Sequence, residues 1–408
     1  MPRLNETPNS SRLHIAIFGR RNAGKSSIIN ALTNQTVSLV SEVAGTTTDP
    51  VSKSMELLPL GPVVLIDTAG IDDQGHLGEL RVKRTFDVLN RTDLAILVID
   101  GTRGAGEWEK KILGLIREKK LPVVGVVNKV DTTDYSNDKI KVWQKELGLA
   151  LIEVSSLTGQ GIDDLKQALI RKAPALEGEP PLVSDLISPG EVVVLVTPID
   201  SAAPKGRLIL PQQQVIRDLL DHGALAMIAR EKELAQALKG LRQKPALVIT
   251  DSQAFAEVSA QTLPDVPLTS FSIVMARYKG DLDELVKGAQ VVEALQPGDR
   301  VLIAEACTHH RQADDIGTVK IPRWLQQKVR GELDLHWCTG FNFPSDLANY
   351  KLIIHCAGCM LNRREMLYRI SQATAEGLPI VNYGVLIAYL HGILPRALAP
   401  FLHKNKNQ

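Results

Sequence analysis

The sequence predicts an α/β protein of three successive blocks, of which the first and the third contain mostly parallel sheets covered by helices. The chain has 408 residues, enough for about two to four domains, and is 44% hydrophobic and 23% charged, as is ordinary for globular proteins. Short apolar runs alternate with amphipathic stretches of helix length, which is typical of parallel strands joined by helical crossovers. The longest apolar runs, such as residues 94–99 and 192–196, have the length of strands and are too short to span a membrane.

The charge and cysteine content exclude several classes of protein. Lys and Arg total 47 against 46 Asp and Glu, and aromatic residues make up only 4%, so we expect no nucleic-acid partner. Four cysteines are too few for a disulfide framework and therefore indicate metal or redox chemistry. Residues 1–14 are polar and contain no signal-peptide core, so we expect a cytoplasmic protein with no membrane partner.

The first domain is expected over residues 1–174, followed by a proline-containing linker over residues 174–189. Its expected strands are residues 14–18, 63–67, 94–100, 122–128 and 151–154. Its expected helices are residues 24–32, 77–89, 107–119, 138–147 and 161–171. Strands separated by helices indicate a parallel sheet.

A small α/β module is expected over residues 190–244 and a third domain over residues 245–408. The module is short for a free-standing core, so we expect it either to form a homodimer with a second copy or to pack on its neighbours in the same chain. Its expected strands are residues 192–197 and 225–229, and its expected helices are residues 212–221 and 231–241. The expected strands of the third domain are residues 246–250, 301–304, 352–354 and 379–381.

A phosphate-binding loop is predicted directly after the first strand. The segment Gly19-Arg-Arg-Asn-Ala-Gly-Lys-Ser matches the pattern G-x-x-x-x-G-K-[ST] and opens a predicted helix. Its backbone N–H groups can surround phosphates, Lys25 can reach the outer phosphates, and the Ser26 hydroxyl can bind Mg²⁺. The residues expected to bind the nucleotide here are Gly19, Asn22, Ala23, Gly24, Lys25, Ser26 and Ser27.

A second motif is expected to complete the phosphate and Mg²⁺ site. Asp67-Thr-Ala-Gly70 follows the second predicted strand, where Asp67 can hold Mg²⁺ through its shell and the Gly70 N–H can contact the third phosphate. Three adjacent threonines lie between the two motifs, and Thr47 is the favoured additional Mg²⁺ ligand among them.

A third group of residues predicts guanine as the base. Asn128-Lys129-Val-Asp131 ends another strand, and a carboxylate at Asp131 can accept from both the ring N–H and the 2-amino group of guanine. Ser155 and Ser156 follow a further strand and are expected to close over the base. Motifs of this kind in this order, each at a strand end, predict a P-loop GTPase domain that binds GTP and GDP. Its expected catalytic residues are Lys25, Asp67 and Gly70.

The GTPase motifs resemble the TrmE–Era branch, the GTPases of tRNA modification and ribosome assembly. The resemblance lies in Arg-Asn22-Ala-Gly-Lys-Ser-Ser and in Gly45-Thr-Thr-Thr-Asp49, where Thr48 replaces the arginine of the family pattern. It implies that Asn22 helps to bind K⁺, although an asparagine there can also simply shape the turn. Ile71 follows Gly70, where many GTPases carry a water-orienting glutamine, so we expect slow hydrolysis that monovalent cations stimulate.

Cysteines and histidines form a second candidate site in the third block. Cys307-Thr-His309 and His355-Cys356-Ala-Gly-Cys359 each follow a predicted parallel strand, and ligands bind at the carboxyl edge of such sheets. Three thiols and a histidine make a metal-ligand set. Residue types alone leave zinc and an iron–sulfur cluster equally open. We expect Cys338 to be a buried thiol and not a ligand.

The combination of both sites resembles the FeFe-hydrogenase maturation GTPases. The resemblance rests on a TrmE–Era-type GTPase followed by C-x-H and H-C-x-x-C, and it covers nearly the whole chain. It implies a scaffold that binds a 4Fe-4S cluster through Cys307, Cys356 and Cys359, with His355 or His309 as an exchangeable fourth ligand. It also implies a transient diiron precursor, received from two radical-SAM maturases and passed to apo FeFe-hydrogenase.

A ribosome- or tRNA-directed GTPase with a structural zinc site is the alternative hypothesis. It predicts a basic RNA-binding element such as a KH domain, with its Gly-x-x-Gly loop. The third block contains no such loop, and the net charge of the chain is only +1.

Overall fold

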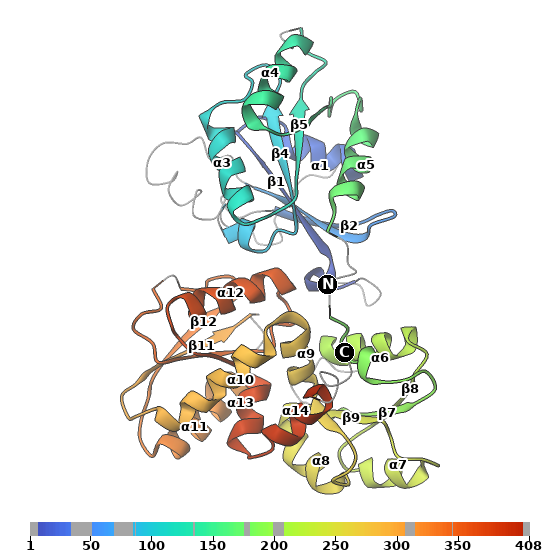
Figure 1. Ribbon diagram of the computed structural model, residues 1–408, viewed down its shortest axis with the longest axis vertical. Helices are drawn as coiled ribbons and strands as arrows, with labels where there is room; N and C mark the ends of the chain where they lie inside the picture. Colours follow the sequence, from blue (N-terminus) through green and yellow to red (C-terminus); the bar gives the residue numbers. More distant parts are fainter. Residues whose placement is uncertain are drawn as a thin grey trace. The chain divides into compact units, whose positions relative to one another are not determined.

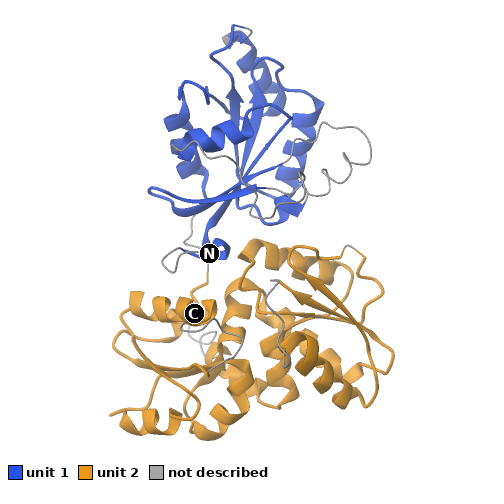
Figure 2. Cartoon of the chain, turned by 180° about the vertical axis from the view of Figure 1, so that it is seen from behind, with its two compact units in different colours: residues 1–177 blue, residues 178–408 orange. Residues whose placement is uncertain are grey.

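A computed structural model describes most of the chain as two compact units, residues 1–177 and 178–408 (Figure 2). Each unit has its own sheets and cores and is described by itself. The described residues are 7–33, 51–68, 85, 87–133, 135–174, 180–198, 208–306, 315–344 and 346–402.

Unit 1 contains a six-stranded sheet in the order β2-β3-β1-β4-β5-β6. All neighbours pair in parallel except β2 and β3, which are antiparallel. The expected strands are confirmed, and β2 is an addition whose exposure alternates along the strand, as suits the edge of a sheet. The strands are β1 (Leu13–Gly19), β2 (Val51–Leu57), β3 (Gly61–Asp67), β4 (Leu94–Asp100), β5 (Val123–Asn128) and β6 (Leu151–Glu153).

Helices cover both faces of this sheet (Figure 1). On one face α1 (Lys25–Thr33) and α5 (Ile162–Lys172) share a core with β1 and β4, and on the other α3 (Glu107–Glu118) and α4 (Asn137–Leu147) share a second core. Because helices cover both faces of the sheet, a ligand can bind only at an edge. In such sheets it binds to the loops at the carboxyl ends of the parallel strands. The helix expected over residues 77–89 lies largely outside the described residues.

Unit 2 contains two four-stranded parallel sheets, in the orders β10-β9-β7-β8 and β12-β11-β13-β14. The first comprises β7 (Val192–Val196), β8 (Leu225–Ala229), β9 (Leu247–Thr250) and β10 (Leu268–Ser270). The second comprises β11 (Arg300–Glu305), β12 (Asp334–Thr339), β13 (Leu352–His355) and β14 (Ile380–Asn382). The mostly parallel sheet expected for the third block is therefore present.

The structure differs from the expected boundary at residues 244 and 245. The strand expected over residues 246–250 corresponds to β9, which pairs with β7 and carries β10 at its other side, so the boundary falls inside one sheet. The expected linker is also partly structural, because Leu182 and Val183 are buried in the core of that sheet. Apolar periodicity predicts a strand but does not reveal which sheet the strand joins.

Helix α9 (Phe271–Lys279) contributes to two cores of unit 2. Phe271 and Val274 pack with β7 and β9, whereas Ile273 and Ala276 belong to the core that also contains the second sheet. The other helices described in unit 2 are α6 (Leu210–Asp221), α7 (Leu234–Gly240), α8 (Phe255–Gln261), α10 (Leu282–Gln290), α11 (Ile321–Val329), α12 (Arg363–Ala375), α13 (Tyr383–Leu390) and α14 (Leu394–Leu402). Within the described residues, every helix is too short or too polar to cross a lipid bilayer.

We predict that Gly288→Ala destabilises unit 2. A Cβ at Gly288 in α10 would lie 2.0 Å from the carbonyl oxygen of Ile380 in β14. The backbone of β14 cannot move away easily, because it is hydrogen-bonded to β13. The free energy of unfolding should fall by about 1–3 kcal/mol, which a thermal melt would detect. Gly240→Ala is the matched control, because a Cβ at that helical position meets no atom within 4 Å. Its stability should stay level or rise by up to about 1 kcal/mol, and equal melting of the two variants would contradict the packing.

Candidate functional site

The phosphate loop connects β1 to α1, and two of its residues have positive φ angles. Asn22 has a φ of 63° and Gly24 a φ of 89°, and a Cβ at Gly24 would lie 2.1 Å from the side-chain nitrogen of Asn128. Only glycine fits at that position. The buried Lys25 ammonium donates to the carbonyls of Gly19 at 3.0 Å and Arg20 at 2.9 Å, so its charge lies within the loop.

Two of the residues expected to bind Mg²⁺, Ser26 at the start of α1 and Asp67 at the end of β3, contact each other. β1 and β3 are neighbours, with Ile17 opposite Asp67, and the Ser26 hydroxyl donates to the Asp67 carboxylate. Burial raises the pKa of Asp67, and the Ser26 bond and the Lys25 charge oppose it. The other carboxylate oxygen of Asp67 is buried and has no hydrogen-bond partner among the described residues. A hydroxyl beside such an oxygen suits a hard cation such as Mg²⁺.

Asn128 joins the phosphate loop to the segment expected to close over the base. Its side-chain amide donates to the Ala23 carbonyl at 3.0 Å and accepts from the Ser156 backbone N–H at 3.1 Å. Only 1% of Asn128 is exposed, so both bonds are shielded from water. The adjacent Ser155 is buried and accepts from the Thr158 N–H, which stabilises the turn after β6.

Lys129 and Asp131 lie on the turn that follows β5. Lys129 has a φ of 67°, and its ammonium forms an ion pair with Asp100 at 2.6 Å. Burial raises the pKa of Asp100, but the hydrogen bonds from Lys129 and Thr102 outweigh it and bring the pKa below its ordinary value. Asp131 is exposed and so accessible to a base. Asp100 is a site residue that sequence reasoning missed, although its position at the end of β4 is a usable signal.

A second missed contact anchors the phosphate loop to α3. The Arg20 guanidinium donates to the Glu109 carboxylate at 2.8 Å, and the Gly106 N–H donates to the same oxygen at 2.8 Å. Glu109 is 1% exposed, and burial raises its pKa against the opposing effect of these donors. The loop is therefore held from β1, β5 and α3 together.

Several expected site residues lie outside the described residues. They are Thr47 and Gly70 in unit 1, with Ile71, and Cys307 and His309 in unit 2. Ala306 is the last described residue before Cys307.

The cysteine segment lies at the carboxyl edge of the second sheet of unit 2. β11 and β13 are paired neighbours, with Ala304 opposite His355. The two strands that precede the cysteine segments are therefore adjacent, as the sequence predicts. The Ala306 N–H donates to the Cys356 sulfur at 3.1 Å, and the Gly358 N–H does so at 3.5 Å. Burial is the main cause that raises the pKa of the Cys356 thiol to about 11, so the thiol is neutral at pH 7 unless a metal replaces its proton.

Both ring nitrogens of His355 are bound within the protein. The side chain is fully buried, Nδ1 lies 2.8 Å from the Cys356 carbonyl oxygen, and Nε2 lies 3.1 Å from the Arg369 guanidinium. A guanidinium can only donate, so Nε2 accepts and the proton lies on Nδ1. Burial and then Arg369 lower the pKa of His355 to about 3. Ligation of a metal by Nε2 would require the Arg369 bond to break.

Arg369 is itself firmly held beside this histidine. It is fully buried, forms an ion pair with Glu365 at 3.0 Å and donates to the Gly340 carbonyl at 2.8 Å. Cys338 lies in β12 opposite Ala304 and is partly buried, and burial raises the pKa of its thiol to about 11. Among the described residues, no three His, Cys, Asp or Glu side chains are grouped closely enough to hold a metal ion.

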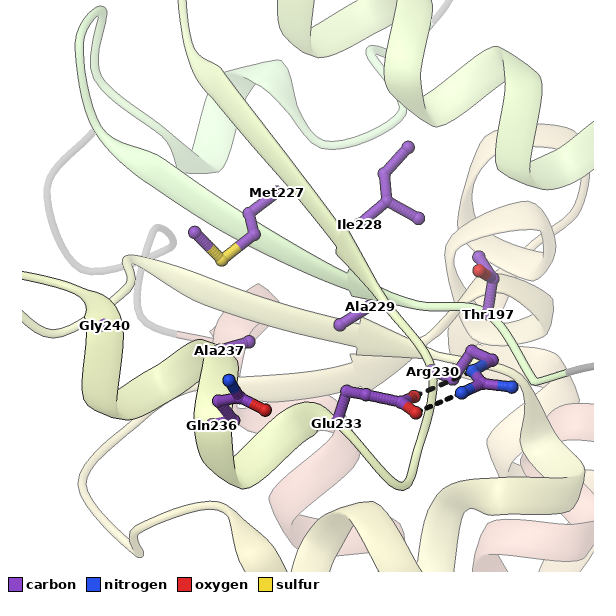
Figure 3. A pocket seen from close by; sticks show the side chains of 9 residues that line it. All are labelled: Thr197, Met227, Ile228, Ala229, Arg230, Glu233, Gln236, Ala237 and Gly240. Atoms are coloured by element: carbon purple, nitrogen blue, oxygen red, sulfur yellow. Dashed lines mark hydrogen bonds and ion pairs between the residues drawn. The ribbon is translucent and has the colours of Figure 1, made fainter.

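A hollow of about 610 Å³ lies elsewhere, between β8 and α7 of the first sheet of unit 2 (Figure 3). Its charged lining residues, Arg230 and Glu233, form an ion pair with each other. The lining has no thiol or imidazole, so the hollow is distinct from the cysteine segment.

We predict that Asn128→Ala weakens the binding of both GTP and GDP by at least about 30-fold, or about 2 kcal/mol. Two buried groups, the Ala23 carbonyl and the Ser156 N–H, would lose their partner, at about 1–3 kcal/mol each. Titration with a fluorescent nucleotide measures the effect. Asn90→Ala is the matched control, because Asn90 is a buried asparagine that accepts from Lys119 before the amino end of β4. Equal affinity of the two variants would contradict this role of Asn128.

Relatives of known function resemble part of this chain. GTPase Der of Mycoplasmopsis pulmonis is 34% identical over 169 residues, which are 38% of this chain and 39% of that protein. GTPase Der of Sulfurihydrogenibium sp. is 36% identical over 168 residues, 39% of this chain and 38% of that protein. The chain thus spans about two fifths of the length of these curated relatives. The solved structure of Aquifex aeolicus Era bound to GDP and aluminium fluoride covers 53% of this chain and 91% of its own, at 21% identity and a TM-score of 0.35.

Family models match all three parts of the chain. Residues 14–129 match a 50S ribosome-binding GTPase model, and the P-loop geometry agrees with it. Residues 182–280 match the hydrogen maturase F dimerization domain, and residues 283–400 match the hydrogen maturase F tetramerization domain. Both matches lie within unit 2 and follow the GTPase domain in order. The chain therefore contains a GTPase domain and belongs to the HydF-type hydrogen maturases.

Proposed function

We propose that this GTPase is a scaffold that binds a 4Fe-4S cluster and delivers the diiron precursor of the active-site cluster to apo FeFe-hydrogenase. The observation that carries the proposal is the pairing of β11 with β13, which sets Cys356 beside the segment leading to Cys307. The family of the chain supports a role in hydrogenase maturation. The two radical-SAM maturases remain an expectation from the family resemblance, and a cytoplasmic location remains one from the sequence.

Cys307, Cys356 and Cys359 are the proposed cluster ligands. Soft thiolates bind zinc, copper(I) and iron–sulfur clusters, and the family favours the last of these. Such a cluster would supply an iron position to which a transferred unit can attach. The chemistry at Cys356 suits this use, since its sulfur accepts two backbone N–H bonds at 3.1 and 3.5 Å. Bonds of that kind to cluster sulfurs are common and help to set the reduction potential.

His309 is the preferred fourth ligand, with His355 as the alternative. Both ring nitrogens of His355 already have partners, and release of its Nε2 would leave a buried guanidinium short of an acceptor. A fourth position held weakly would suit a carrier, because a cluster with four strong ligands has no place for an incoming unit.

GTP is proposed to act as the switch of the scaffold. Thr47 and Gly70 would contact Mg²⁺ and the third phosphate, so hydrolysis would release their loops. Ser26 and Asp67 would hold Mg²⁺, and Asn22 is a candidate K⁺ ligand whose left-handed backbone also serves the turn. Slow hydrolysis is expected, because Ile71 cannot orient water.

The ribosome- or tRNA-directed alternative is not favoured. The GTPase relatives match only the first part of the chain, whereas hydrogen maturase F models match residues 182–280 and 283–400. The zinc alternative remains an outcome of the metal analysis below.

Homodimerisation is proposed to use β8 of the middle module. β8 ends its sheet, so its outer backbone groups have no strand beside them within the described chain. Leu225 and Ile228 are 56% and 49% exposed on this strand, and Met227 and Ile228 point to opposite sides of it (Figure 3). An apolar edge strand favours pairing with another strand, and the family model for residues 182–280 is a dimerization domain.

We predict that the anaerobically reconstituted protein contains about four irons per chain, absorbs broadly as a brown protein and gives an EPR signal on reduction. Cys356→Ala should lose all three properties, because a ligand thiolate is gone. Lys25→Ala is the reciprocal control, since its hydrolysis should collapse while its iron content stays at the wild-type level. Zinc without iron in the reconstituted wild type would overturn the cluster.

We predict that Ile228→Lys disrupts the dimer. A charge at the edge strand opposes pairing, and sedimentation analysis should show a loss of the larger species by at least about tenfold in association constant, or about 1.4 kcal/mol. Leu263→Lys is the matched control, because Leu263 is 56% exposed elsewhere in unit 2. A wild-type protein that sediments as a single copy would contradict the proposal, as would equal behaviour of the two variants.

A further inference from the structure

Lys279 is a buried cation beneath the Cys-x-x-Cys loop. It is the last residue of α9 and only 1% exposed. Its ammonium donates to the carbonyls of Gly358 at 3.2 Å, Cys359 at 3.1 Å and Leu361 at 2.6 Å. One side chain from another part of the chain therefore holds three peptide units of the loop that carries Cys359.

These bonds fix the direction of the loop's N–H groups. In a planar trans peptide the C=O and the N–H point in opposite directions. The Gly358 carbonyl shares its peptide with the Cys359 N–H, and the Cys359 carbonyl shares its peptide with the Met360 N–H. Because both carbonyls point to the ammonium, both N–H groups point away from it. One peptide earlier, the Gly358 N–H already points to the Cys356 sulfur.

The position of Lys279 is secured from both sides. Arg363 follows the loop in the sequence. Its guanidinium donates to the carbonyls of Tyr278 and Gly280, the residues on either side of Lys279. Gly358 has a φ of 63°, and the Leu361 N–H donates to its carbonyl at 3.0 Å, which closes the loop over the ammonium. The backbone of the loop is therefore determined by α9 and not by the loop sequence alone.

We propose that Lys279 is a positioning residue of the iron–sulfur site, which turns the amide N–H groups of the Cys-x-x-Cys loop toward the cluster sulfurs and thereby raises the cluster's reduction potential. The inference rests on the proposed cluster. N–H groups aimed at cluster sulfurs favour the reduced state, which carries one more negative charge. Lys279 lies in the segment that matches the dimerization domain, whereas the loop lies in the segment that matches the tetramerization domain. The site is thus shaped by a residue outside its own domain.

Lys279→Gln and Lys279→Met test the proposal in the full-length reconstituted protein. Glutamine keeps an amide donor without the charge, and methionine removes every donor. An EPR-monitored redox titration should give a more negative midpoint potential for both, with the larger shift for methionine. Iron loss to a chelator should be about tenfold faster for methionine. This is the lower end of the effect, about 10–100-fold, of removing a residue that supports a metal ligand. Lys287→Met is the matched control, since Lys287 is an exposed lysine on α10 paired with Glu284, and it should match the wild type.

The outcomes separate this inference from the proposed function. Loaded clusters with wild-type potential and wild-type iron loss in both Lys279 variants would overturn the inference, while loss of the cluster in Cys356→Ala would leave the proposed function standing. A wild type that takes up no cluster would overturn both. If circular dichroism shows that Lys279→Met does not fold, Lys279→Gln decides the question, because its two N–H donors can serve only two of the three loop carbonyls and its midpoint potential should still become more negative.

Discussion

The parallel pairing of β11 with β13 is the interaction on which the cysteine site depends. It sets Ala304 opposite His355, so that the segments following the two strands leave the sheet side by side. The Ala306 N–H then reaches the Cys356 sulfur, and the chain continues directly into Cys307. Without this register, the two cysteine segments would lie at unrelated places in the chain, since more than forty residues separate them. The hydrogen bonds of this sheet therefore bring the two segments together, as the proposed ligand set requires.

The same geometry builds the nucleotide site in unit 1. β3, β4 and β5 lie in one sheet with their carboxyl ends at one edge, and they end in Asp67, Asp100 and Asn128. The Ser26 hydroxyl, at the start of the helix after β1, donates to Asp67 at the end of β3. The Asn128 side chain donates to the Ala23 carbonyl in the phosphate loop. Parallel sheets thus place chemistry at both sites of this protein for one reason: strands joined by crossovers all end at the same edge.

Buried cations support the cysteine site from below. Arg369 donates a hydrogen bond to Nε2 of His355, and Lys279 donates to three carbonyls of the cysteine loop. A buried cation is costly to desolvate, so each is surrounded by acceptors that compensate for the lost water. Both side chains come from helices, α12 and α9, that pack on the sheets of unit 2. They thereby connect His355 and the cysteine loop to other elements of unit 2.

The sequence alone determined the order of the nucleotide motifs, the existence of most strands and the candidate thiols, because these features are local. A glycine-rich loop before a helix, or a short apolar run, carries its meaning within a few residues. Tertiary structure decided which sheet β9 joins, that His355 is bound by Arg369, and that Lys279 lies beneath Cys359. These features depend on partners far away in the chain. Periodicity predicts whether a residue is buried but not what it is buried against, so only the folded arrangement could select those partners.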